Sequence, residues 1–223
     1  MLARRLVLVL LIAGCPADPG DSSGESDSAT GESATTTAPA TTSDPTTSDP
    51  TGSDTGDDDS AVWNAPYCRP VKDGPAWPPA FQTWEEQVLA LVNEARALGH
   101  DCDTKGKFGP APPLTMNASL RCAARKHAAD MSTRNFFDHV NPDGETFDQR
   151  ITQAGYGSYA QVGENIAGGS DIDNASTAVE GWLASDGHCA NIMNAFYTEF
   201  GAGAYEGSGD LTFYWTQEFG RPN

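Results

Sequence analysis

Apolar residues recur at helical spacing soon after residue 80 of this 223-residue chain. They follow one another at steps of four, three, four and three, which places them on one face of a helix. Thr83 and Glu86 form a capping-box pattern before them, and Gly99 follows the last of them. The apolar positions are Trp84, Val88, Leu91, Ala95 and Leu98. The pattern therefore predicts a first amphipathic helix over residues 83–98.

The same spacing predicts three more helices. The second follows Asn117, which is suited to cap a helix, the third runs near residues 146–154 and the fourth near 171–185. The residues expected to face inward are Leu120, Ala124, His127 and Met131, then Phe147 and Ile151, then Ile172, Ala175, Val179 and Trp182. Because His127 lies on an apolar stripe, we interpret it as a core histidine or one that supports a site.

A period of two replaces the helical period near the C-terminus. Apolar side chains alternate with mostly polar ones over residues 211–219, which predicts a strand. Residues 207–210 supply a turn, and residues 201–206 supply the partner strand. Helices first and a hairpin last indicate an α+β fold, in which helices cover an antiparallel sheet.

The first residues have the features of an export signal. Two arginines precede the apolar run Leu6–Ala13, which is too short to span a bilayer. Residues 11–15 read Leu-Ile-Ala-Gly-Cys, which resembles the bacterial lipobox, whose Cys is diacylated and becomes the first residue. The sequence predicts a lipoprotein signal peptide over residues 1–14 and lipidation at Cys15. An ordinary signal peptide that contains a cysteine is the alternative.

The composition then divides the chain into a linker and a domain. Residues 16–60 contain no aromatic residue, Val, Leu or Ile. Such a stretch has nothing to bury, so we predict a disordered acidic linker over residues 15–62. Residues 63–223 suffice for one domain, which opens with a proline-rich, irregular arm over residues 63–81. The formal charge of −18 argues against nucleic acid and anionic membrane surfaces as partners, leaving the lipid anchor as the expected membrane contact.

Several spaced segments of the domain carry a family resemblance. They are residues 136–144, 163–167, 185–192 and 214–220, with Trp182 before the third. Two of the four histidines stand in the first and third segments, and the second segment reads Gly-Glu-Asn around Glu164. We predict that these three segments are loops at the ends of secondary elements. In this order they closely resemble the CAP superfamily over roughly residues 83–220. That superfamily includes cysteine-rich secretory proteins, insect venom antigen 5, plant pathogenesis-related proteins and many bacterial secreted proteins.

The resemblance implies an α-β-α sandwich with a cleft that holds two histidines and two acidic residues. By motif, His139 and His188 match the histidines, and Glu164 matches the acid of the Gly-Glu-Asn motif. The position of the second acid is Ser185 here, so that acid is missing. Two nearby acids are candidates to replace it, namely Asp186 and Glu180.

These residue types suit a divalent metal ion such as Zn²⁺. We predict His139 and His188 as metal ligands. If the metal activates water for hydrolysis, Glu164 is the expected catalytic residue. A purely structural hydrogen-bonding role for the three residues is a further interpretation. Without the second acid, we expect weak metal binding and poor general-base chemistry.

Four cysteines remain once Cys15 is set aside. An even number in an exported chain predicts two disulfides, for which three pairings are possible. Cys102 follows the first helix and Cys189 lies beside a cleft histidine, so a bridge between them would anchor that segment. Cys68 would then join the arm to the second helix through Cys122. We predict these two bridges.

The leading functional interpretation is a CAP module tethered to the bacterial cell envelope that binds an unidentified lipid, glycan or protein. The alternative is a metal-dependent hydrolase that acts on peptides or another envelope polymer with the same residues.

Overall fold

The computed structural model describes residues 66–68 and 77–223. The predicted signal peptide, Cys15, the linker 15–62 and most of the arm lie outside the described residues. The helices are α3 (Pro79–Leu98), α4 (Ala118–Thr133), α5 (Phe147–Gln153), α6 (Ala175–Leu183) and α7 (Asp186–Met193), with a short 3-10 helix η1 (Asp103–Lys105). The strands are β1 (His100–Asp101), β2 (Lys107–Phe108), β3 (Thr115–Met116), β4 (Tyr159–Gly168), β5 (Glu199–Glu206) and β6 (Phe213–Pro222).

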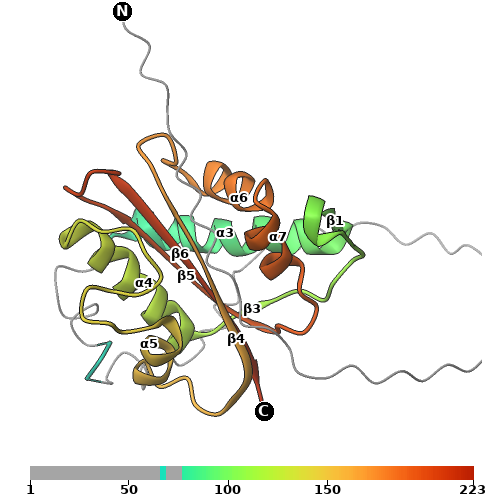
Figure 1. Ribbon diagram of the computed structural model, residues 1–223, viewed down its shortest axis with the longest axis horizontal. Coiled ribbons are helices and arrows are strands. Elements are labelled where there is room, and N and C mark those ends of the chain that lie inside the picture. The colour runs from blue at the N-terminus through green and yellow to red at the C-terminus, as the bar shows by residue number, and fades with distance from the viewer. Residues whose placement is uncertain (1–65, 69–76) are drawn as a thin grey trace, which may run out of the picture. The chain divides into compact units, whose positions relative to one another are not determined.

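Four of the strands form one sheet in the order β3-β5-β6-β4. Strand β6 pairs antiparallel with β4 and β5, while β3 adds a two-residue parallel edge to β5. Helices α4 and α5 lie on one face of the sheet, and α3, α6 and α7 lie on the other (Figure 1). The predicted α-β-α sandwich is confirmed, with one short parallel strand at the edge of an otherwise antiparallel sheet.

Helix α4 packs against β5 at very short range. A Cβ atom at Gly201 or Gly203 would collide with the main chain of α4 at Leu120 or Ala124. The helix begins as predicted, because the side-chain oxygen of Asn117 accepts two backbone N–H groups of the first turn at 2.9 and 3.2 Å. Its predicted inward stripe, which includes His127, is completely buried.

The first helix differs from its prediction in both start and buried face. It begins at Pro79, because the fixed φ of proline suits the first helical position. The Thr83 hydroxyl donates to the Pro79 carbonyl at 3.1 Å instead of capping the helix. Leu98 is 75% exposed, whereas the charged residues Glu85 and Arg96 lie on the buried face. The predicted stripe is confirmed at Val88, which is completely buried, and at Trp84 and Leu91, which are partly buried against the core, but not at Leu98. A hydrophobicity pattern assigns charged residues to the surface, so the burial of Glu85 and Arg96 was missed.

Both buried charges have partners from distant parts of the chain. The Glu85 carboxylate accepts from the Trp77 indole at 2.8 Å, from Arg121 at 2.8 Å and from Arg125 at 2.6 Å. The Arg96 guanidinium donates to the main-chain carbonyl groups of residues 112, 192, 194 and 197 at 2.7–3.3 Å. These contacts are what allow two ionised side chains to be buried.

Two other predicted elements are shorter or of a different type. The fourth helix begins at Ala175 and not near residue 171, because the Asn174 side chain caps it by accepting from Thr177 N at 3.1 Å. Residues 185–192, predicted as a loop, form helix α7 after the N-cap residue Ser185. The third helix is confirmed, with a capping box at Thr146.

The predicted C-terminal hairpin is present as β5 and β6, but β1, β2, β3 and β4 were missed. In β6, every residue from Tyr214 to Gly220 is buried, and in β4 so are residues 163–166. Helices cover both faces of this sheet, so neighbouring residues on a strand are buried together. Strand β6 nevertheless keeps a period of two in its sequence, whereas β4 buries the polar residues Glu164 and Asn165 between Gly163 and Ile166 and gave no strand pattern.

Two disulfides join the elements, in the pairing that was predicted. Cys68 is bonded to Cys122 of α4, and Cys102 is bonded to Cys189 of α7. The first bridge holds the described part of the arm against α4, and the second holds α7 beside η1. Within residues 66–68 and 77–223, no helix is both long and apolar enough to cross a bilayer.

Candidate functional site

The structure brings residues of three elements together in what we call the histidine site, namely His139, Glu164 and His188. His139 lies in the loop after α4, Glu164 in the middle of β4 and His188 in α7. The expectation that three loops supply these residues was wrong for two of them. The His139 Nδ1 atom lies 2.7 Å from Glu164 Oε1, which makes Glu164 the residue that orients this ring.

The second oxygen of Glu164 is also occupied. Arg150 of α5 donates from Nη2 to Glu164 Oε2 at 2.7 Å and to the His139 carbonyl at 3.0 Å. His127 of α4 lies 3.9 Å from the same oxygen, while its Nε2 atom is 2.9 Å from the Asp138 carbonyl. Glu164 is thus enclosed by one guanidinium and two imidazoles.

Glu218 is a second acid beside Glu164, opposite it in the pairing of β4 with β6. Burial raises the pKa of Glu218 well above its usual value, and the negative charge of Glu164 raises it further. Burial also opposes ionisation of Glu164, but His127, Arg150 and the hydrogen bond with His139 outweigh it and hold the pKa of Glu164 below its usual value. At neutral pH the pair therefore consists of an ionised Glu164 and a protonated Glu218.

Neither acid proposed from the sequence to replace the missing one lies at the histidine site. Asp186 is exposed and accepts hydrogen bonds from the hydroxyl and main-chain N–H of Thr104. Glu180 is exposed and accepts from the Ser176 hydroxyl at 2.9 Å. Ser185 itself is buried. The acid that neighbours Glu164 comes from a strand, a position that the family motif around Ser185 does not indicate.

His188 is positioned by the main chain of α7. Asn165 donates to the His188 carbonyl at 3.1 Å, and Asn191 of α7 donates back to the Asn165 side chain at 2.9 Å. Burial and, to a smaller extent, the charge of His139 lower the pKa of His188 to about 4. The His188 ring is therefore neutral at physiological pH, and His139 is close enough to act on it electrostatically.

Sequence reasoning missed three residues that build the site, namely Arg150, Asn165 and Glu218. A signal existed for Arg150, because it shares the inward face of the third helix with Phe147 and Ile151 at helical spacing. Asn165 and Glu218 stood inside motifs that were used for recognition, but nothing local showed that they are completely buried.

The donor atoms available to a metal ion follow from these contacts. Glu164 uses both carboxylate oxygens within the protein, and His139 uses Nδ1. Among the described residues, no group of three or more His, Cys, Asp or Glu side chains is arranged to hold a metal ion. The atoms of the three residues outside these contacts are His139 Nε2 and the ring nitrogens of His188, so the set leaves at most two protein ligands.

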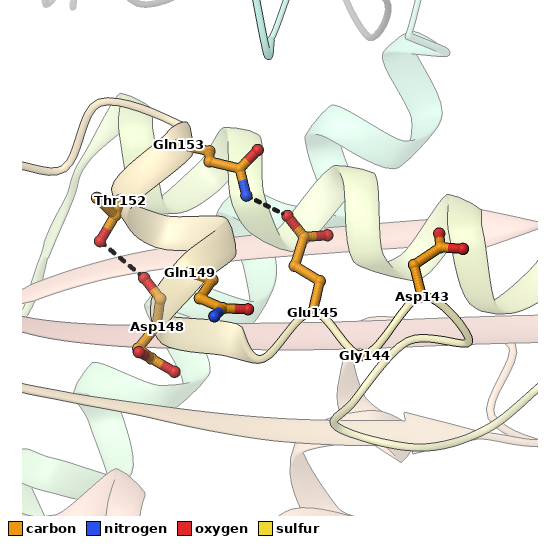
Figure 2. Close-up of a pocket in the computed structure, with 7 residues that line it drawn as sticks. All are labelled: Asp143, Gly144, Glu145, Asp148, Gln149, Thr152 and Gln153. Atoms are coloured by element: carbon orange, nitrogen blue, oxygen red, sulfur yellow. Dashed lines mark hydrogen bonds between the residues drawn. The ribbon is translucent and has the colours of Figure 1, made fainter.

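A depression of about 750 Å³ lies beside α5, away from the histidine site (Figure 2). It is lined by Asp143, Gly144, Glu145, Asp148, Gln149, Thr152 and Gln153. Figure 2 shows that Gln153 donates to Glu145 and that the Thr152 hydroxyl donates to the main chain of Asp148. None of the residues of the histidine site lines it, so it does not take part in their chemistry.

Comparison with known proteins agrees with the motifs. The sequence profile of the Cysteine-rich secretory protein family (CAP) matches residues 89–219. The chain is 35% identical to the uncharacterized protein YkwD of Bacillus subtilis over 144 residues, which cover 64% of this chain and 49% of YkwD. It is 33% identical to the uncharacterized membrane protein YlbC of the same bacterium over 143 residues, which cover 64% of this chain and 36% of YlbC.

A solved structure shares the fold. It is an extracellular protein containing a SCP domain from Bacillus anthracis, with a TM-score of 0.53 and 28% identity, covering 66% of this chain and 45% of that chain. This chain therefore spans half or less of the length of each of these three proteins. The profile match covers more than half of the chain, including every segment that carried the resemblance up to Phe219. The chain belongs to the cysteine-rich secretory protein (CAP) family.

Proposed function

We propose that this protein is a CAP-domain lipoprotein of the bacterial cell envelope that acts by binding. In this proposal, Cys15 carries the lipid anchor, residues 15–62 form an acidic spacer and residues 63–223 form the binding domain. The ligand is a lipid, a glycan or a protein, held with the help of a divalent ion such as Zn²⁺ at His139 and His188. Family membership and the lipobox-like sequence before Cys15 support the location.

The observation that carries the proposal is the 2.7 Å contact of His139 Nδ1 with Glu164 Oε1. A carboxylate that accepts from one ring nitrogen of a histidine fixes the tautomer and leaves the other nitrogen with a lone pair. This is the usual arrangement behind metal-binding histidines. Glu164 is therefore a positioning residue for His139.

The second ligand is His188, whose neutral ring has the form that binds metal. Two imidazoles leave the remaining coordination positions of a tetrahedral ion to solvent or to a donor group of the bound partner. We expect a dissociation constant in the micromolar range or weaker. When bound, the ion would supply a Lewis-acidic centre that a ligand oxygen could contact.

Hydrolysis is less well supported by the same contacts. A general base needs a free lone pair and a pKa near the working pH. Glu164 has both oxygens engaged and a pKa held below its usual value, while Glu218 is buried and protonated. The geometry therefore favours binding over catalysis.

Calorimetry with ZnCl₂ at pH 7.5 tests the metal site. We expect one weak site in the wild type, no measurable binding in His139→Ala or His188→Ala, and unchanged binding in His100→Ala, which lies in β1. Glu164→Gln should weaken binding about 10–100-fold by removing the charge that orients His139. Identical heats for the wild type and His139→Ala would show that His139 is not a ligand.

A substrate-turnover assay distinguishes the two candidate functions, binding and hydrolysis. Wild type loaded with Zn²⁺ should leave peptide and envelope-polymer substrates intact while it still binds the ion. Metal-dependent turnover that is lost in His188→Ala would decide for the hydrolase instead.

The lipid anchor at Cys15 is tested separately from the metal site. Mature protein should partition into detergent, and Cys15→Ser should release it to the aqueous phase or block its processing. Aqueous wild-type protein with a free Cys15 thiol by mass spectrometry would contradict lipidation.

A further inference from the structure

A second pocket, of about 420 Å³, lies between α4, α5 and the loop that joins them. We call it the α4–α5 pocket. It is lined by α4 residues from Lys126 to Arg134, by the loop from Asn141 to Glu145, by Arg150 and by Tyr67. Neither His139 nor His188 lines it, so it is distinct from the histidine site.

The charges around this pocket are balanced. Three basic and three acidic residues line it, namely Lys126, Arg134, Arg150, Asp130, Asp143 and Glu145. Arg134 is paired with Asp130 and lies 2.6 Å from Asp143, and Lys126 donates to the Tyr67 carbonyl at 2.9 Å. Because the lining carries no net charge and its outer charges are paired, the pocket does not select an ion.

Two completely buried side chains, His127 and Arg150, also line the pocket. Each has one nitrogen without a hydrogen-bond partner among the described residues, namely His127 Nδ1 and Arg150 Nε. The other ring nitrogen of His127 faces the Asp138 carbonyl. The other two nitrogens of Arg150 donate to the Glu145 and His139 carbonyls and to the Glu164 carboxylate. A buried polar atom without a partner costs about 1–3 kcal/mol, so each of these atoms is a point where a ligand would be favoured.

The chemistry of the two atoms is complementary. The Asp138 carbonyl can only accept, so the His127 Nε2 atom that faces it at 2.9 Å carries the hydrogen. His127 Nδ1 therefore presents a lone pair, in keeping with a ring that burial keeps neutral. Arg150 Nε can only donate. The atoms that approach Glu164 Oε2 are His127 Nε2, at 3.9 Å, and Arg150 Nη2, at 2.7 Å, so the two side chains are neighbours.

A hydroxyl group satisfies both requirements at once, since it donates to a lone pair and accepts from an N–H. We propose that the α4–α5 pocket binds a neutral, hydroxyl-rich ligand of monosaccharide size. A hydroxyl donates to His127 Nδ1, and a ligand oxygen accepts from Arg150 Nε. The volume lies in the lower part of the usual range for small-molecule pockets. Binding here does not require a metal at the histidine site.

Saturation-transfer NMR with methyl glucoside and N-acetylglucosamine as probes tests this on the full chain, in the presence of a chelator. We expect millimolar binding of at least one probe by the wild type. Ala129→Trp fills the pocket from α4 and should weaken binding by about tenfold or more. Ala118→Trp adds the same side chain to the same helix outside the pocket and should bind as the wild type does.

A second readout reports on the proposed atom itself. On saturation with the probe, the ¹⁵N resonance of His127 Nδ1 should shift, while the ring resonances of His100 should not. Thermal unfolding establishes that each variant folds, and Thr133→Trp, at the exposed end of α4, is a second way to block the pocket. Absence of binding of both probes, binding that survives both blocking variants, or an unchanged His127 Nδ1 resonance would overturn the proposal.

Discussion

At the scale of single residues, the buried charges around Glu164 set the properties of the histidine site. Glu164 and Glu218 face each other on paired strands, and Arg150 is the guanidinium that contacts Glu164. Two carboxylates beside one cation cannot both ionise cheaply in a buried site. One of them is therefore a hydrogen-bonding acid at neutral pH, and the protein environment assigns that state to Glu218.

A pair of amide substitutions tests this assignment. Glu164→Gln leaves Arg150 buried without its counter-charge and should lower the free energy of unfolding by about 3–5 kcal/mol. Glu218→Gln replaces a neutral acid with an amide of the same shape and should change it by less than about 1 kcal/mol. Urea unfolding at pH 7 measures both. Equal losses in the two variants would mean that Glu218 is ionised.

The neutral state of His127 makes folding depend on pH. Burial lowers its pKa from 6.5 to about 4, partly opposed by the charge of Glu164. Between these values the unfolded chain binds the proton more strongly, so stability should fall as pH drops from about 6.5 to 4, by about 3 kcal/mol for this residue. Glu218 acts in the opposite direction, because its raised pKa favours the folded state at low pH.

The test therefore compares how steeply the free energy of unfolding changes with pH, and not its absolute value. The free energy of unfolding of His127→Gln should decrease less steeply than that of the wild type between pH 6.5 and pH 4. His100→Gln, in β1 and only partly buried, is the matched histidine substitution for comparison. A His127→Gln variant with an unchanged slope would show that burial does not lower the pKa of this ring in the folded protein.

At the scale of elements, α3 and α4, which lie on opposite faces of the sheet, are joined by a cluster of buried charges. Glu85 of α3 is completely buried and contacts Arg121 and Arg125 of α4, together with the Trp77 indole. Such a cluster fixes the position of one helix relative to the other, because displacing either helix would leave a buried charge without a partner.

Neighbouring glutamates provide a matched comparison for this cluster. Glu85→Gln should destabilise the protein by about 3–5 kcal/mol, since it leaves two arginines facing a neutral side chain. Glu86→Gln, one residue away and exposed, should cost less than about 1 kcal/mol. Chemical denaturation of the two variants measures the difference, and similar midpoints for both would contradict the role given to Glu85.

At the scale of the domain, the two disulfides have different consequences for the histidine site. Cys102–Cys189 fastens α7, which carries His188, whereas Cys68–Cys122 fastens the described part of the arm to α4. Both close long segments of chain, of 87 and 54 residues, and each is expected to stabilise the fold by about 2–4 kcal/mol.

Removing each disulfide separately should distinguish its effect on thermal stability from its effect on Zn²⁺ affinity. The paired Cys102→Ser and Cys189→Ser variant should lose both thermal stability and Zn²⁺ affinity, because α7 is freed. The paired Cys68→Ser and Cys122→Ser variant should lose stability but keep its Zn²⁺ affinity within about threefold. Thermal melts and calorimetry measure the two effects. Equal losses of affinity would show that the Cys102–Cys189 bridge has no special role at the site.

Much of this architecture was predictable from local patterns. The cap at Asn117, the inward stripe of α4, the third helix and the C-terminal hairpin follow from side-chain periodicity and capping chemistry, which act within a few residues. The spaced motifs identified His139, Glu164 and His188 as a set. The structure shows that the first two are in contact and that the third lies within electrostatic reach.

The sequence by itself thus determined the helices that show an apolar face, the hairpin and the family. Only the tertiary structure decided that β4 is a strand, that residues 186–193 are a helix and that Glu85, Arg96, Arg150 and Glu218 are buried. The reason is physical. A charged side chain can be buried only when partners from distant segments satisfy it, and a strand covered on both faces can bury polar residues that interrupt its apolar pattern. Neither condition leaves a trace in neighbouring residues, so both had to be read from the folded chain.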